Sequence, residues 1–137
     1  MESEQIVGII PDLKHKKGFL KYEGCNVIVT DRRLIVARMT KEMRKSLGDT
    51  PLDQKYRGMT MDAILAETQG NFAIAADEIK RIRVERGSGG DIEVSGGSDR
   101  LIVKTTSSKY LFTFGGKSIP AKEARALLKE AFGEVVK

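Results

Sequence analysis

The sequence predicts a mainly β domain in which two near-orthogonal antiparallel sheets are closed at one end by a C-terminal α-helix. In the second half, runs that alternate apolar and polar residues recur about every ten residues, separated by turns rich in glycine and serine. Near the C-terminus the apolar spacing changes to the three-and-four spacing of a helix. The 137 residues fit a single domain, 1–137.

The first half predicts a smaller set of strands. The N-terminal stretch 3–10 fits either a helix or a strand, and Pro11 is expected to end it in both cases. The segment 18–38 predicts a strand, a kink at Gly24, a second strand, a tight turn and a third strand.

The tight turn is predicted from VIVTDRRLIV, residues 27–36, where two apolar runs flank four polar residues. Asp31 favours a turn through its side chain. We expect Arg33 to begin the next strand and to pair with a nearby acid, and Arg32 to point toward solvent.

Residues 40–70 break the β pattern and predict a helical insertion. TKEMRKSLG is typical of a short polar helix that Gly48 closes. TPLDQKYRG is expected to form a loop, and TMDAILAETQ a second short helix capped by Thr60. NFAIAADEI then returns to the sheet.

Four strands of a meander are expected next, over 79–85, 91–95, 100–105 and 109–114. A terminal helix is expected over 119–136, with Ser118 as its cap and Pro120 in its first turn. One apolar stripe marks the face of this helix that is expected to cover the sheets: Ala124, Leu127, Leu128, Ala131, Phe132 and Val135.

The composition limits the chemistry that the chain can perform. With Cys25 as the sole cysteine and His15 as the sole histidine, an internal disulfide and a four-ligand Cys/His zinc site are excluded. We expect His15 to lie in a basic loop, LKHKK, rather than to serve as a ligand or catalytic base. FGGKS, residues 114–118, lacks the earlier glycine of a phosphate-binding loop and is expected to be a strand-to-helix turn. We therefore expect no enzyme, no catalytic residues, no cofactor and no metal.

The arrangement and three of its motifs resemble the prokaryotic PH-like (pleckstrin homology-like, GRAM-like) domain family. VIVTDRRLIVAR is similar to the family's strand–turn–strand element, NFAIAADEIKRIRVE to a later strand–turn–strand element, and YLFTFGG to the segment before the terminal helix. The resemblance implies a PH-like barrel capped by the C-terminal helix, with the insertion at 40–70 as a departure from simple members. The family includes phosphoinositide binders, peptide binders and scaffolds, so the resemblance implies a fold more than a function.

Basic residues form the candidate site. The net charge is +5 with a pI near 9.4, and the cations fall into three sequence clusters, near 14–21, 32–38 and 80–86. If the first two clusters meet at one end of the sheet, they form an anion- or lipid-binding rim; the alternative is a set of unrelated solvated side chains. The residues of the predicted rim are Lys14, Lys16, Lys17, Lys21, Arg32 and Arg33.

We expect a non-catalytic, cytoplasmic interaction or scaffold module that binds a protein partner or associates with itself. The alternative is peripheral binding of an anionic lipid or membrane surface through the basic rim, because basic side chains are attracted to anionic headgroups. Nucleic acid is disfavoured as a partner, since only the pI points to it and the tyrosines are not interleaved with basic residues.

Overall fold

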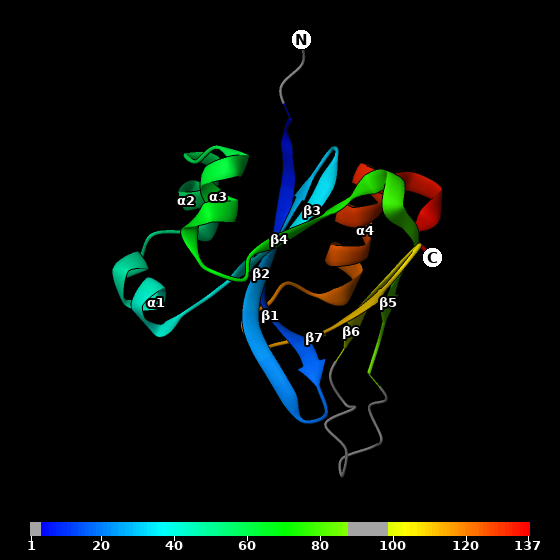
Figure 1. Cartoon of the computed structure of the whole chain (residues 1–137), viewed down its shortest axis with the longest axis horizontal. Coiled ribbons are helices and arrows are strands. Elements are labelled where there is room, and N and C mark those ends of the chain that lie inside the picture. Colours follow the sequence, from blue (N-terminus) through cyan, green and yellow to red (C-terminus); the bar gives the residue numbers. More distant parts are fainter. Residues whose placement is uncertain (1–3, 88–98) are drawn as a thin grey trace.

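The computed structural model describes residues 4–87 and 99–137. Within these ranges seven strands pair in one antiparallel sheet of order β4-β3-β2-β1-β7-β6-β5 (Figure 1). The strands are β1 (Ile6–Gly18), β2 (Lys21–Thr30), β3 (Arg33–Arg38), β4 (Phe72–Ala75), β5 (Ile79–Glu85), β6 (Arg100–Thr105) and β7 (Lys109–Phe114). The mainly β architecture is confirmed. The predicted strand over 91–95 lies outside the described residues.

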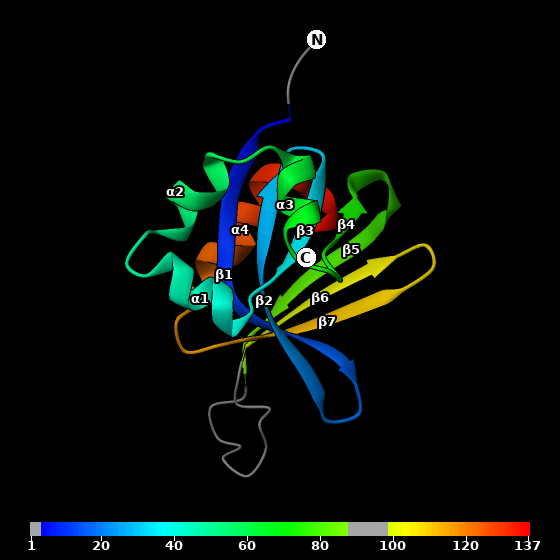
Figure 2. The same cartoon turned by 60° about the vertical axis from the view of Figure 1, so that its left-hand side comes forward.

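Strand β1 joins the two predicted sheets into one. Up to Ile10 it pairs with β2, and from Leu13 it pairs with both β2 and β7. The register shifts between these two residues, and Asp12 adopts a left-handed conformation with φ of 52°. Pro11 was expected to end the segment, but it lies inside this bulge, where a missing backbone N–H does not interrupt the ladder. The strand therefore continues, and β5–β7 run in a different direction from β1–β3 (Figure 2).

Hydrogen bonds hold the bend at Asp12 from three sides. Its backbone N–H donates to Oδ1 of Asn26 on β2 (3.0 Å), and its carbonyl accepts from the N–H of Gly115 (2.8 Å). Its carboxylate accepts from the N–H of Lys117 (2.8 Å), in the loop that follows β7. The bend therefore ties β1, β2 and the end of β7 together.

Helix α4 (Ala121–Phe132) packs against the inner face of the bent sheet (Figure 1). Ala124 and Leu128 are buried there, and the predicted stripe of the helix joins the same core. The helix is shorter than expected and continues as a 3-10 turn, Gly133–Val135. Ser118 does not cap it: Pro120 holds the cap position, and the Ser118 hydroxyl is buried without a hydrogen bond in the described structure.

The insertion covers the outer face of the first half of the sheet. It forms α1 (Lys41–Leu47), α2 (Leu52–Arg57) and α3 (Met61–Glu67), and Tyr56 and Ile64 pack on β2 and β3. Thr40 and Thr60 cap α1 and α3 through their side chains. The expected loop over 50–58 is wrong, because residues 52–57 form α2, whose Tyr56 is buried against the sheet.

We expect Gly115→Ala to destabilise the fold by about 1–3 kcal/mol. An added Cβ would lie 2.4 Å from Oδ2 and 2.8 Å from the backbone oxygen of Asp12, so the bend itself would have to move. Gly116→Ala is the matched control, because its Cβ would meet nothing within 4 Å. Chemical denaturation measures both, and equal stabilities of the two variants would contradict the role of the bend.

Candidate functional site

Residues 18–21 form the turn of the β1–β2 hairpin, which we call the hairpin tip. Gly18 pairs with Lys21, and Phe19 and Leu20 lie between them with 87% and 77% of their surface exposed. The expected strand beginning at residue 18 is thus wrong at its start: the chain turns there, and β2 begins at Lys21. Two large apolar side chains therefore stand in solvent at the end of a hairpin.

The backbone of the hairpin tip is unfavourable for the residue that occupies it. Leu20 has φ of 59°, in the left-handed region. That conformation costs a residue with a Cβ roughly 1–2 kcal/mol, and glycine or asparagine is the usual occupant. A bulky, exposed leucine at this position contributes no core packing to offset the cost, which favours a role outside the fold.

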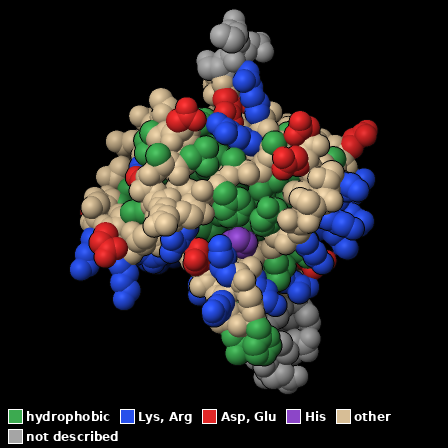
Figure 3. Space-filling view, viewed as in Figure 1, with side chains coloured by type: hydrophobic (Ala, Val, Ile, Leu, Met, Phe, Trp, Pro, Cys, Tyr) green, Lys and Arg blue, Asp and Glu red, His purple; other side chains and the backbone are tan. Residues whose placement is uncertain are grey.

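Four lysines lie at or next to the hairpin tip: Lys14, Lys16 and Lys17 precede it, and Lys21 is its last residue. Lys14, Lys16, Lys17 and Lys21 are all exposed. Lys14 and Lys16 share the outer face of the hairpin with Tyr22, which is opposite Lys16 in the register. Figure 3 shows apolar side chains at the lower end of the molecule with Lys and Arg side chains just above them. The first sequence cluster therefore does converge around one projecting element.

The arginines of the predicted rim lie elsewhere. Arg32 and Arg33 follow β2 at its other end, whereas the hairpin tip precedes β2. Arg33 donates two hydrogen bonds to the Glu4 carboxylate (2.9 and 3.0 Å), so its charge is paired. Burial raises the pKa of Glu4, but hydrogen bonds from Arg33 and Thr30 outweigh it and leave that pKa below its ordinary value. One rim made of both clusters is therefore not formed.

His15 is buried rather than placed in a loop, so that expectation is wrong. It lies in β1 with 8% of its surface exposed, and its ring stacks on Phe112 at a centroid distance of 4.8 Å. Phe72 and Tyr110 complete the aromatic cluster around it. Alternation along β1 explains the burial, because Leu13 and His15 face inward while Lys14 and Lys16 face outward.

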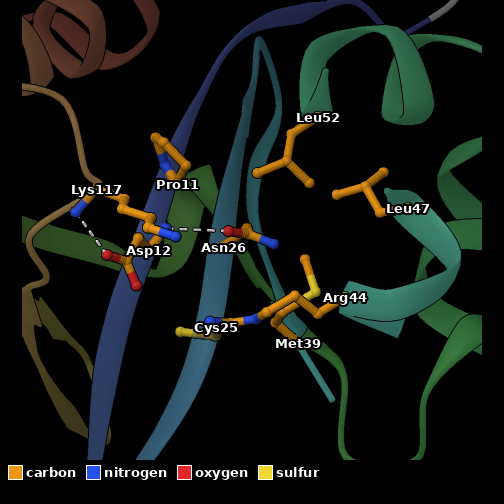
Figure 4. A pocket seen from close by; sticks show the side chains of 9 residues that line it. All are labelled: Pro11, Asp12, Cys25, Asn26, Met39, Arg44, Leu47, Leu52 and Lys117. Atoms are coloured by element: carbon orange, nitrogen blue, oxygen red, sulfur yellow. Dashed lines mark hydrogen bonds between the residues drawn. The ribbon is translucent and has the colours of Figure 1, made fainter. Parts of the chain in front are cut away.

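A small cavity of about 170 Å³ lies where the bend of β1 meets the insertion (Figure 4). Asn26 lies between Asp12 and the apolar side chains of the insertion, and its Nδ2 donates to the Tyr56 hydroxyl (3.4 Å). Burial raises the pKa of the adjacent Cys25 thiol to about 12, which keeps the thiol protonated and unreactive. The volume is below the roughly 300 Å³ of ordinary ligand pockets, so we interpret the cavity as a joint between sheet and insertion.

Two absences concern the described residues, 4–87 and 99–137. No group of three or more His, Cys, Asp or Glu residues in these ranges is placed to hold a metal ion. No helix within them has the length and apolar character needed to cross a membrane.

Comparison with known proteins bears on the fold. No protein-family model matches the chain, and no curated protein matches it. The chain is similar to the crystal structure of the C-terminal domain of an unknown protein from Leishmania infantum, with a TM-score of 0.54 and 13% identity over 94% of this chain and 84% of that one. The similarity supports a shared mainly β fold.

Phe19 and Leu20 are the candidate residues that sequence reasoning missed. The signal was present: GFLK breaks the alternation of a strand, and lysines flank it on both sides. Assigning Gly18 to a turn rather than to a strand would have placed both apolar side chains at the hairpin tip.

We expect the stability of the protein to fall below about pH 6.5 because of His15. Burial lowers the pKa of His15 from 6.5, the Lys17 charge lowers it further and the Glu23 charge opposes this. The unfolded chain takes up the proton at a higher pH than the folded protein does. The contribution of His15 to the free energy of unfolding is therefore fully present above the pKa of the unfolded chain, and it declines as the pH falls toward the pKa of the folded protein. Melting temperatures from about pH 8 to about pH 5 should drop less for His15→Phe than for the wild type. Parallel curves would contradict this assignment.

Proposed function

We propose that this chain is a non-catalytic, PH-like binding module that attaches peripherally to anionic membrane surfaces through the hairpin tip. The observation that carries the proposal is the pair Phe19 and Leu20, exposed in a turn where Leu20 holds a strained left-handed backbone. Support for the PH-like assignment comes from the motifs in 27–38, 71–85 and 110–116, together with the bent antiparallel sheet and terminal helix.

The hairpin tip combines the two forces that hold peripheral proteins on membranes. Burying a phenylalanine or leucine side chain in an apolar phase is worth about 1.5–3 kcal/mol each. Each lysine near an anionic surface adds about 1 kcal/mol, and four exposed lysines lie at or next to the hairpin tip. Apolar residues at the very end with cations set back from it match the order of acyl chains and headgroups in a bilayer.

Self-association and a protein partner are the alternatives for the same surface. Two copies that meet through their hairpin tips would bring eight lysines together, four from each chain, which disfavours a tip-to-tip dimer. A partner protein with an apolar pocket and an acidic rim remains a distinct candidate. A vesicle flotation assay distinguishes such a partner protein from a membrane.

The test uses vesicles of phosphatidylserine mixed with phosphatidylcholine, and vesicles of phosphatidylcholine alone, in a flotation assay. The wild type should bind the anionic vesicles. The double variant Phe19→Ser/Leu20→Asn should lose at least about tenfold in partition coefficient. Its melting temperature should be unchanged or higher, because asparagine tolerates the left-handed conformation better than leucine.

Charge is tested separately. Lys16→Gln/Lys17→Gln should weaken binding to anionic vesicles, whereas the matched control Lys41→Gln/Lys45→Gln, on exposed positions of α1, should not. Equal binding to anionic and neutral vesicles, or equal loss in both charge variants, would contradict the proposal. A wild type that binds no vesicles but forms a Phe19-dependent complex with a purified protein would assign the hairpin tip to a protein partner instead.

A further inference from the structure

A second basic surface lies on the outer face of β5, β6 and β7. Arg81, Arg83 and Glu85 of β5 point outward there, because Ile82 and Val84 face the core. Outward residues of β6 and β7 join them around one shallow hollow. The residues lining it are Arg81, Arg83, Glu85, Arg100, Ile102, Lys104 and Lys109, which we call the basic face.

The register arranges the basic face in rows across the strands. Lys104 is the cross-strand partner of both Arg81 and Lys109, so three cations stand side by side. At the other end of these strands, the register places Glu85 opposite Arg100, Arg100 opposite Thr113, and Thr113 opposite Lys14 of β1. The row therefore continues onto the outer face of the hairpin, where Lys16 follows Lys14.

The row Arg81–Lys104–Lys109 is electrostatically unfavourable as it stands. Like charges directly opposite each other on neighbouring strands are destabilising. Glu85 forms ion pairs with Arg100 (2.7 Å) and Arg83 (3.7 Å), at the far end of the basic face. Among the described residues no ion pair reaches Arg81, Lys104 or Lys109. An external polyanion would relieve the repulsion.

The basic face is open and points away from the direction of the hairpin tip. The insertion covers the outer face of β2 and β3, and it does not extend over β5–β7 in the described structure. The hairpin tip projects along β1 and β2, and β1 lies beside β7 in the same sheet, whereas the side chains of the basic face stand perpendicular to that sheet. With the tip in a membrane, the cations of the basic face would thus point along the bilayer rather than into it.

We propose that the basic face binds the phosphodiester backbone of a nucleic acid, a partner that the sequence alone disfavours because only the pI points to it. Adjacent strands are about 4.8 Å apart, so cations on three neighbouring strands form a dense two-dimensional array of positive charge. A duplex carries one negative charge per about 1.7 Å of its axis, whereas an extended acidic peptide carries at most one per residue, about 3.3 Å. The cations of the basic face lie on three neighbouring strands, so a duplex, which presents two rows of phosphates, can contact more of them than a single extended peptide can. The apolar side chain in the hollow is Ile102, which offers no ring for base stacking, so contacts are to phosphates and carry no sequence preference.

The experiment measures fluorescence anisotropy of a labelled random-sequence DNA duplex over a series of salt concentrations. The wild type should bind with an affinity that falls steeply with salt, and the logarithmic slope should lose about 0.9 for each phosphate contact removed. Arg81→Gln/Lys104→Gln/Lys109→Gln should reduce both the affinity, by at least about tenfold, and the slope. Its melting temperature should equal or exceed that of the wild type, because a repulsive row has been neutralised.

The matched control Lys41→Gln/Lys45→Gln/Lys122→Gln removes the same charge at exposed positions of α1 and α4. It should bind the duplex much better than the basic-face variant, and Phe19→Ser/Leu20→Asn should bind like the wild type. No binding by the wild type, or equal losses in the two charge variants, would overturn the proposal. Binding of polyglutamate instead of the duplex would also overturn the proposal. A basic-face variant that loses binding to anionic vesicles, while the wild type binds no duplex, would overturn it as well.

Discussion

The bend of β1 at Asp12 is the constraint on which the architecture depends. Its backbone and carboxylate bind β2, the end of β7 and the loop before α4 through three hydrogen bonds, and Gly115 leaves the space that this contact needs. Beyond the bend, β1 serves both halves of the sheet. Without it, the hairpin would not pair with β7, and neither the hairpin tip nor the continuation of the basic face onto Lys14 would be placed as observed.

Local signals in the sequence predicted much of the fold. Alternation located β5, β6 and β7, and the caps Thr40 and Thr60 marked two helices of the insertion. Features that depend on contacts between residues distant in sequence could not be predicted in this way. Pro11 is tolerated only because a bulge forms opposite β2, and α2 depends on burial of Tyr56 against β-strands distant in sequence. Neither effect leaves a pattern in a short stretch of sequence.

The candidate surfaces show the same division between local and non-local information. The lysines at the hairpin tip are close in sequence and lie together in the structure, whereas β2 separates them from Arg32 and Arg33. The basic face draws on three strands and on β1, so only the register reveals it. The hairpin tip offers apolar insertion with charge behind it, and the basic face offers charge alone. The two surfaces therefore suit polyanions of different form.

The most direct test of membrane attachment uses the absence of tryptophan from the sequence. Phe19→Trp places a single indole at the exposed end of the hairpin tip without disturbing the core. With vesicles containing phosphatidylserine, its fluorescence emission should shift to shorter wavelengths, because the ring leaves water for the acyl chains, and phosphatidylcholine vesicles alone should produce little shift. Emission that stays characteristic of a solvated indole while the protein is bound to anionic vesicles would contradict insertion of the hairpin tip.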